Sequence, residues 1–381
     1  MLSRRKFNLG LASGIATLAV PLAKGSSIES PRTTTPRIRG EWTKHPLAQY
    51  PKAVGASSKH TRWAWRALTG DWYLNGGDYT QHGETPSVLE SGSNNTWRVD
   101  IRKNTWERVS GYWPKEGEII PSHPDETIWV YDSKRDIFWF GGGYQWPAYS
   151  PADRPEAAPV PIAVQNRMLR GHWMSFDPNT KKWKDHGLYG GPGASKHGIY
   201  DAQTDTVYAP YYDGGWGNAL TIYHCATGTW GPRTAMGGPN IGDIREDYFA
   251  FDSRRRRMLF LSKIDFSAHC YDIGARKWFE LPTRKPRPHR GYGSYGLTYH
   301  AGLDVYVMHG GGSINPPQAT NDLWILPSEG GEWQEVTMRG SLPSPRVSQV
   351  LMYDPGMDAL ISFGGKDGVD DHAYFVARIG A

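Results

Sequence analysis

Residues 298–336 read TYHAGLDVYVMHGGGSINPPQATNDLWILPSEGGEWQEV, and this stretch sets the pattern of the whole chain. It contains an aromatic residue and a turn ending in Asp, a strand ending in glycines, a second hydrophobic strand, a polar turn and Trp333. Its first half recurs as VYDSKRDIFWFGGG at 130–143 and MYDPGMDALISFGG at 352–365, with a variant, RALTGDWYLNGGD, at 66–78. Its second half recurs at Trp106, Trp183, Trp230 and Trp278. Self-similarity at a spacing of about 50 residues predicts a repeat architecture.

The strand ending in Gly-Gly and the tryptophan after the later turn resemble the kelch repeat, over nearly all of residues 39–381. The resemblance implies an all-β fold, a six-bladed kelch-type β-propeller. The expected blades are 59–109, 127–186, 197–232, 248–281, 291–336 and 346–379. We expect the glycines where backbones crowd near the propeller axis. We expect the tryptophans to fill the space between neighbouring blades, so that no blade is stable alone.

The sixth expected blade lacks a tryptophan strand, because the chain stops after HAYFVARIGA at 372–381. A matching strand occurs near the other end, where GEWTKHP at 40–46 resembles GEWQEVT at 331–337. We therefore predict that the N-terminal strand completes the last blade. Such a strand would close the ring and leave no open sheet edge.

The first 25 residues, MLSRRKFNLGLASGIATLAVPLAKG, have the features of an export signal: arginines, a short apolar stretch and small residues suited to cleavage. Residues 3–7, SRRKF, resemble the twin-arginine signal, although Asn8 and Leu9 depart from its usual Leu and Lys. The alternative is an ordinary secretory signal. Either predicts a periplasmic or secreted protein with a linker at 26–39, a propeller at 40–381 and no membrane span once the signal is removed.

The apparent basicity of the chain comes mostly from this segment. Removing residues 1–25 takes away four of the 43 Lys and Arg residues and no acidic residue, which leaves 39 basic against 38 acidic residues. A nearly neutral protein argues against nucleic acid as a partner. Cys225 and Cys270 lie at different distances from the tryptophan that follows each, so a disulfide between them is left open but not favoured. The basic run Arg254–Arg257 falls in the first turn of the fourth blade and is interpreted as a solvated hairpin tip.

Loops around one mouth of a propeller's central channel are where function in such folds usually lies. The segments that lead into the innermost strands are rich in cations, imidazoles and carboxylates: Lys59, His60, Arg62, Glu126, Lys196, His197, Arg245, Glu246, His289, Arg290, Tyr292 and Arg346. The loops after the second strands add the aromatic residues Tyr144, Trp146 and Trp216. Positive charge converging in a concave mouth would attract a carboxylate or sulfate group, which arginines could bind bidentately. The competing interpretation is that about half of these polar residues only connect blades and that the aromatic residues pad the rim.

The leading expectation is an exported enzyme that acts on an acidic oligo- or polysaccharide, most concretely a uronate polysaccharide lyase working by β-elimination. Arg62, Arg245, Arg290 or Arg346 would neutralise the carboxylate, His60, His197 or His289 would act as the base, and Tyr292 as the acid. Lys59, Glu126, Lys196, Glu246, Arg346, Tyr144, Trp146 and Trp216 would bind the substrate. The comparison with other propeller lyases is an analogy of fold. No metal ligand set or cofactor is predicted, a divalent metal is left open, and a monomer is expected.

Three alternatives stay open. The chain is similar in size and architecture to N-acetylneuraminate epimerase-like propellers, which implies a sugar epimerase or mutarotase using Glu126 or Glu246. A copper-radical oxidase resembling galactose oxidase is weaker, because Tyr223-His224 and Tyr299-His300 are expected on the opposite face. The third is a carbohydrate- or protein-binding propeller without enzymatic activity. An enzyme should hold a His or Tyr within hydrogen-bond reach of an Arg or a carboxylate.

Overall fold

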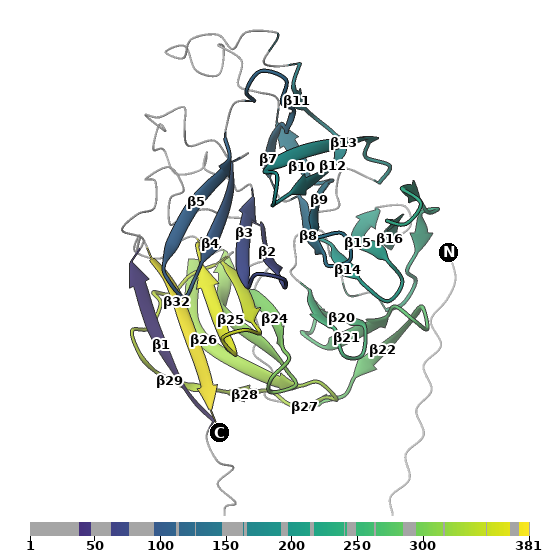
Figure 1. Cartoon of the computed structure of the whole chain (residues 1–381). Coiled ribbons are helices and arrows are strands. Elements are labelled where there is room, and N and C mark those ends of the chain that lie inside the picture. The colour runs from purple at the N-terminus through teal and green to yellow at the C-terminus, as the bar shows by residue number, and fades with distance from the viewer. Residues whose placement is uncertain are drawn as a thin grey trace, which may run out of the picture. The chain divides into compact units, whose positions relative to one another are not determined.

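The computed structural model is a six-bladed β-propeller built from antiparallel sheets, which confirms the predicted fold class (Figure 1). The structure describes residues 38–46, 62–75, 95–111, 114–125, 127–146, 163, 166–191, 197–213, 217–239, 241, 249–262, 264–284, 295–314, 317–347, 349–365 and 373–380. The predicted signal peptide lies outside these residues, as does the predicted linker except for Ile38 and Arg39.

Each of the first five blades is a meander of four strands that pair in chain order. Blade 1 contains β2 (Arg62–Arg66), β3 (Asp71–Asn75), β4 (Thr96–Asp100) and β5 (Thr105–Ser110). Blade 2 contains β8 (Ile128–Asp132), β9 (Ile137–Gly141), β12 (His172–Asp177) and β13 (Lys182–Leu188). Blade 3 contains β14 (Ile199–Asp201), β15 (Thr206–Asp213), β16 (Gly217–His224) and β17 (Thr229–Trp230), with β18 (Thr234–Ala235) also paired to β16. Blade 4 contains β19 (Ala250–Asp252), β20 (Arg257–Leu261), β21 (Ala268–Asp272) and β22 (Lys277–Leu281). Blade 5 contains β24 (Gly296–His300), β25 (Val305–Ile314), β26 (Pro317–Pro327) and β28 (Gln334–Glu335).

Short strands connect or extend the blades. They are β6 (Ile120–Pro121) with β11 (Met168–Leu169), β7 (His123–Asp125) with β10 (Tyr144–Trp146), and β23 (Thr283–Arg284) with β27 (Gly331–Glu332). None of the residues described forms a helix long and apolar enough to span a membrane.

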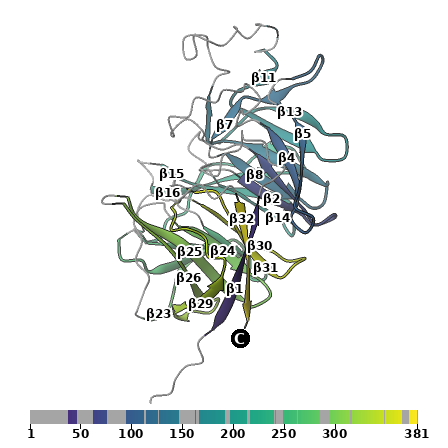
Figure 2. The ribbon, with the colours of Figure 1, turned by 90° about the vertical axis from the view of Figure 1, so that its left-hand side faces the viewer.

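Blade 6 joins strands from both ends of the described chain. It contains β30 (Val350–Asp354), β31 (Ala359–Phe363), β32 (Ala373–Gly380) and β1 (Arg39–Pro46), with β29 (Thr337–Gly340) parallel to β1 on the outside. β1 pairs antiparallel with the whole of β32, from Arg39 opposite Gly380 to Pro46 opposite Ala373. Figures 1 and 2 show the purple β1 beside the yellow β32. The predicted closure of the ring by an N-terminal strand is confirmed.

The Asp that follows the aromatic residue of the repeat explains why the first two strands form a tight hairpin. In blade 2 the Asp132 carboxylate accepts hydrogen bonds from the backbone N–H groups of Lys134 and Arg135, at 3.0 and 3.1 Å. Asp252 and Asp354 do the same for the turns of blades 4 and 6. A side chain that satisfies its own turn in this way favours the turn over a continuous strand.

The hydrophobic core is divided into six clusters, each shared by two neighbouring blades. Each repeat tryptophan lies in a different cluster, where it packs with residues of the blade that precedes its own around the ring. The combinations are Trp106 with blade 6, Trp183 with blade 1, Trp230 with blade 2, Trp278 with blade 3, Trp333 with blade 4 and Trp42 with blade 5. The predicted role of the tryptophans between blades is confirmed.

The glycines at the end of the second strand lie where two blades meet closely. Gly310 has a φ of 59°, and a Cβ atom there would lie 2.5 Å from Gln349 Nε2 and 3.0 Å from the backbone oxygen of Arg346. The N–H of Gly311 donates to the same Arg346 oxygen at 2.9 Å. A side chain at Gly310 would therefore push blade 5 away from blade 6, which confirms the predicted crowding.

Candidate functional site

The strands of each blade have two ends, which we name the mouth end and the turn end. The mouth end is where the first strand begins and the second strand finishes, and the turn end is where a hairpin joins these two strands. Arg62 and Asn75 pair across β2 and β3 at the mouth end of blade 1, and both are buried.

Arg62 meets a histidine from blade 3 at the mouth end. Its Nη2 atom lies 3.4 Å from Nε2 of His197, which precedes β14 and also packs against Phe249. Because a guanidinium group can only donate, Nε2 is the acceptor and the imidazole carries its proton on Nδ1. The structure thus brings together two residues that the sequence selected separately, from blades that are not sequence neighbours.

Two buried polar groups beside these blade starts were missed by sequence reasoning. Asn75 is fully buried, and its Nδ2 donates to Thr96 Oγ1 at 2.9 Å, while its Oδ1 has no hydrogen-bond partner in the part of the chain that the structure describes. His309 is equally buried, with Nδ1 3.2 Å from Ser362 Oγ and its ring 5.0 Å from that of Trp42. In the sequence, both residues stand directly before a pair of glycines, in LNGG and MHGGG. This position could have identified them as candidates.

Arg346, predicted to bind substrate, is buried and donates to the protein itself. Nη1 donates to the Gly364 backbone oxygen at 3.1 Å, and Nε and Nη2 donate to the backbone oxygen and Oγ of Ser344, both at 3.0 Å. The guanidinium carbon also lies 5.0 Å from the centre of the Phe375 ring. These contacts tie the start of blade 6 to its own second and third strands.

Other predicted site residues are placed only by backbone pairing or lie outside the described residues. Tyr144 and Trp146 lie in β10 and pair with Asp125 and His123 of β7. Those outside the described residues are Lys59, His60, Glu126, Lys196, Trp216, Arg245, Glu246, His289, Arg290 and Tyr292.

The turn end carries ion pairs that cross from blade to blade. Arg66 of blade 1 contacts Asp136 of blade 2, and Arg135 of blade 2 binds Asp205 of blade 3 at 2.6 and 2.7 Å. Each of these aspartates also accepts a hydrogen bond from a tyrosine of its own blade, Tyr131 or Tyr200. Hydrogen bonding to Arg135 lowers the pKa of Asp205 well below its usual range.

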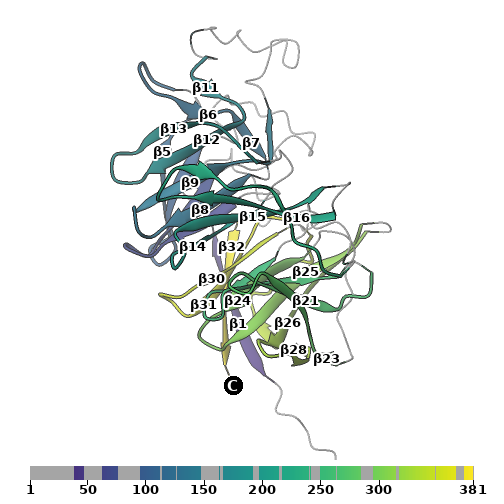
Figure 3. The same cartoon turned by 90° about the vertical axis from the view of Figure 1, so that its right-hand side faces the viewer.

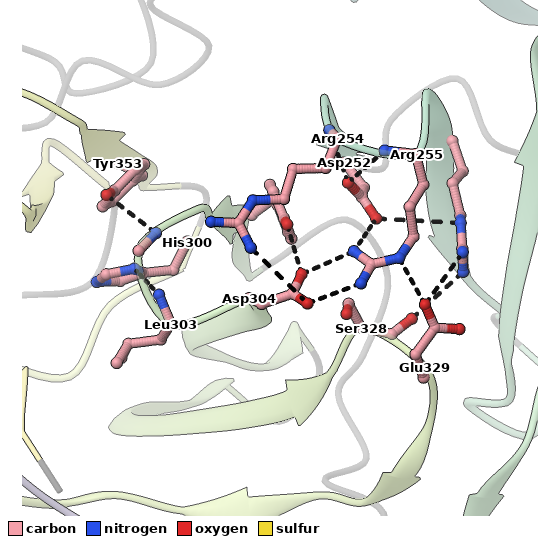
Figure 4. A network of polar contacts seen from close by, with 12 residues as sticks. Asp252, Arg254, Arg255, His300, Leu303, Asp304, Ser328, Glu329 and Tyr353 are labelled. Atoms are coloured by element: carbon pink, nitrogen blue, oxygen red, sulfur yellow. Dashed lines mark hydrogen bonds and ion pairs between the residues drawn. The ribbon is translucent and has the colours of Figure 1, made fainter.

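The interpretation of Arg254–Arg257 as a solvated hairpin tip is wrong. The run does lie in the first turn of blade 4, but Arg255 binds both oxygens of Asp304 in blade 5 at 2.7 Å and also contacts Glu329 (Figure 4). Arg256 reaches the other way, to both oxygens of Asp201 in blade 3. The run therefore connects three blades, because neighbouring turns present carboxylates within reach of its guanidinium groups.

Cys225 and Cys270 are both buried and not disulfide-bonded. Burial raises the pKa of each thiol to about 12, so both stay protonated at neutral pH. Cys225 lies close to the carboxylates of Asp132 and Asp205, a set whose composition could suit a metal ion. Arg135 already binds both carboxylates, so its guanidinium group occupies the position of a cation there.

Comparison with known proteins finds no family model that matches this chain and no significant match among curated proteins. The fold and the geometry of the mouth end are therefore the basis for function.

Proposed function

We propose that this protein is an exported kelch-type propeller that binds an acidic polysaccharide at its mouth end and cleaves it by β-elimination beside a uronate carboxylate. The contact between Arg62 and His197 carries the proposal, because it joins a cation and a basic imidazole nitrogen at one point. A lyase needs this pair: a positive group for the substrate carboxylate, and a base for the carbon next to it.

The contact between Arg62 and His197 also sets the order of the steps in the proposed reaction. In the free protein, Arg62 donates to His197 Nε2 and occupies the lone pair that a base must use. A substrate carboxylate would attract the Arg62 guanidinium group and release Nε2. His197 Nε2 then takes the proton from the carbon beside the carboxylate. The electrons of that C–H bond form a carbon–carbon double bond as the bond to the leaving sugar oxygen breaks, and an acid, for which Tyr292 is the candidate, protonates that oxygen.

The test follows the ultraviolet absorbance of the new conjugated double bond during incubation of the chain with a panel of uronate polysaccharides. We expect His197→Gln to lower turnover by about 10²–10⁴-fold, the usual contribution of a positioned base. Arg62→Gln should lower it as well and weaken binding. His224→Gln is the matched control, because His224 is exposed at the turn end of β16. Absorbance that stays flat with every polymer, or that rises equally in His197→Gln, would exclude this mechanism.

A second candidate is a propeller that binds the same class of polymer without cleaving it. It needs only a cation and no base: Arg346 donates to Ser344 and to the Gly364 backbone, and among the predicted arginines that the structure describes Arg62 is then the one to bind the carboxylate. Binding of uronate oligosaccharides with no change in absorbance would identify this function. Weaker binding in Arg62→Gln, with binding unchanged in His197→Gln, would place the carboxylate at the arginine.

A further inference from the structure

A concave site lies at the outer seam between blades 2 and 3. A groove of about 450 Å³ is lined by Lys182, Lys184 and His186 of β13, by Ser175 of β12 and by the turn after β16. Figure 3 shows these two blades one above the other, with β8 over β14. The volume lies within the range of small-molecule sites.

The groove is open because aromatic packing fills only one end of the seam. Beside the start of β12, Trp173 contacts Tyr189 and Trp230, with ring centres 5.9 and 5.0 Å apart. Trp230 belongs to β17, which has only two residues, whereas β13 has seven. The wall formed by Ser175, Asp177 and the facing part of β13 therefore presents polar side chains to the groove, and Tyr223 of blade 3 lies at its floor.

The charge of this wall is a feature of blade 2 alone. Lys182 and Lys184 flank Trp183, whereas the pairs that flank the other repeat tryptophans are Thr105 and Glu107, Thr229 and Gly231, Lys277 and Phe279, Glu332 and Gln334, and Glu41 and Thr43. Alternation along the strand directs Trp183 into the core with blade 1 and both lysines to the face of the groove. In the part of the chain that the structure describes, neither lysine has an ion-pair partner, unlike Lys181, which pairs with Glu107.

The other polar groups of the groove offset only part of this charge: the Asp177 carboxylate lies opposite Lys182 in the pairing of β12 with β13, whereas Lys184 lies opposite Ser175. Arg135 is bound to Asp132 and Asp205, and the Asp177 carboxylate accepts the N–H groups of its own turn. His186 Nε2 lies 2.8 Å from Ser175 Oγ, and its ring lies 4.9 Å from Trp139. Partial burial, with Lys184 adding to it, lowers the pKa of His186, so that it is a neutral hydrogen-bonding group.

We propose that this groove binds a carboxylate or sulfate group of an acidic saccharide chain, as an attachment point separate from the mouth end. The identity of the polymer rests on the proposed function. The two ammonium groups bind the anion, while His186 and Ser175 hydrogen-bond to neighbouring sugar hydroxyl groups. Trp139 and Tyr223 line the floor but are almost fully buried, so recognition uses charge and hydrogen bonds rather than ring stacking.

The test is calorimetric titration of the chain with a uronate oligosaccharide, a sulfated oligosaccharide, a neutral oligosaccharide of equal length, and inorganic sulfate. We expect the double variant Lys182→Gln/Lys184→Gln to lower the affinity of one class of site about tenfold. High salt should lower the affinity of the same sites in the unchanged protein. Lys277→Gln is the control, since Lys277 precedes Trp278 as Lys182 precedes Trp183. Equal affinity for the neutral sugar, or for inorganic sulfate alone, would overturn the proposal, and so would binding that the double variant leaves intact.

A further comparison separates this proposal from that of the mouth end. Arg62→Gln and His197→Gln should keep the lysine-dependent binding, while the double lysine variant should keep turnover of short oligosaccharides. Lysine-dependent binding with no turnover of any polymer would support the groove and reject the lyase. Turnover without lysine-dependent binding would support the lyase and reject the groove.

Discussion

Asp304 shows how a single residue connects two blades. It has a φ of 57°, a conformation that Asp adopts more readily than most residues. Its carboxylate accepts the Tyr299 hydroxyl of its own blade at 2.5 Å and both guanidinium N–H groups of Arg255 in blade 4. The same residue therefore shapes its hairpin and binds the neighbouring one.

The first prediction concerns the pH dependence of this contact. Hydrogen bonding to Arg255 lowers the pKa of Asp304 well below its usual value. Because the folded pKa lies below the unfolded one, the contact stabilises the fold fully above about pH 4, the usual pKa of Asp, and loses this effect as the pH falls further. We expect Asp304→Asn to cost about 1–3 kcal/mol of unfolding free energy at pH 7 and less at pH 3, measured by urea denaturation.

Asp358→Asn provides the control, because Asp358 occupies the same turn position in blade 6, is mostly exposed and has His300 rather than an arginine nearby. Its effect should be small at both pH values. A cost in Asp304→Asn that does not change between pH 7 and pH 3 would contradict the assignment to the charged pair.

At the scale of elements, the end of β25 shows why the second strands finish in glycine. We expect Gly310→Ala to cost about 2–5 kcal/mol, because it adds the strain of a positive φ to a clash with Gln349 and the Arg346 backbone. Gly171→Ala measures the strain of a positive φ alone, because Gly171 has a φ of 70° and open space around its Cβ position. It should cost about 1–2 kcal/mol of unfolding free energy. Equal shifts in the urea midpoint of the two variants would show that crowding between blades is unimportant.

Elements that repeat could be predicted from the sequence, because four of the six hairpins carry an Asp at the start of the turn and each blade has its own tryptophan. Contacts between blades could not be predicted in detail. Arg255 and Asp304 belong to different repeats, so no single motif shows that they meet. Arg62 and His197 were each selected as polar residues at a blade start, but their contact depends on how blades 1 to 3 lie around the ring. The groove escaped prediction because it depends on the short β17.

At the scale of the whole molecule, Trp42 tests the closure of the ring. It is 1% exposed and packs with Phe375 of its own blade and with Val307 and Leu323 of blade 5. We expect Trp42→Ala to cost about 3–5 kcal/mol. Because every core cluster is shared by two blades, calorimetry should still show one cooperative transition at a lower temperature. Trp106→Ala, at the same position in blade 1 but only partly buried, should cost less. A separate low-temperature transition in Trp42→Ala would mean that blade 6 unfolds independently.

The pairing of β1 with β32 also orders events during synthesis. β1 is the first of the described strands to leave the ribosome, and β32 is the last. Until residues 373–380 have been translated, β1 lacks its antiparallel partner and Trp42 lacks the side chains of β32 that cover it. The nascent chain therefore carries β1 without its strand partner while the strands of five blades are made, and an unpaired strand edge can pair wrongly during folding. Closure of the propeller therefore waits until the last of the described strands has been made.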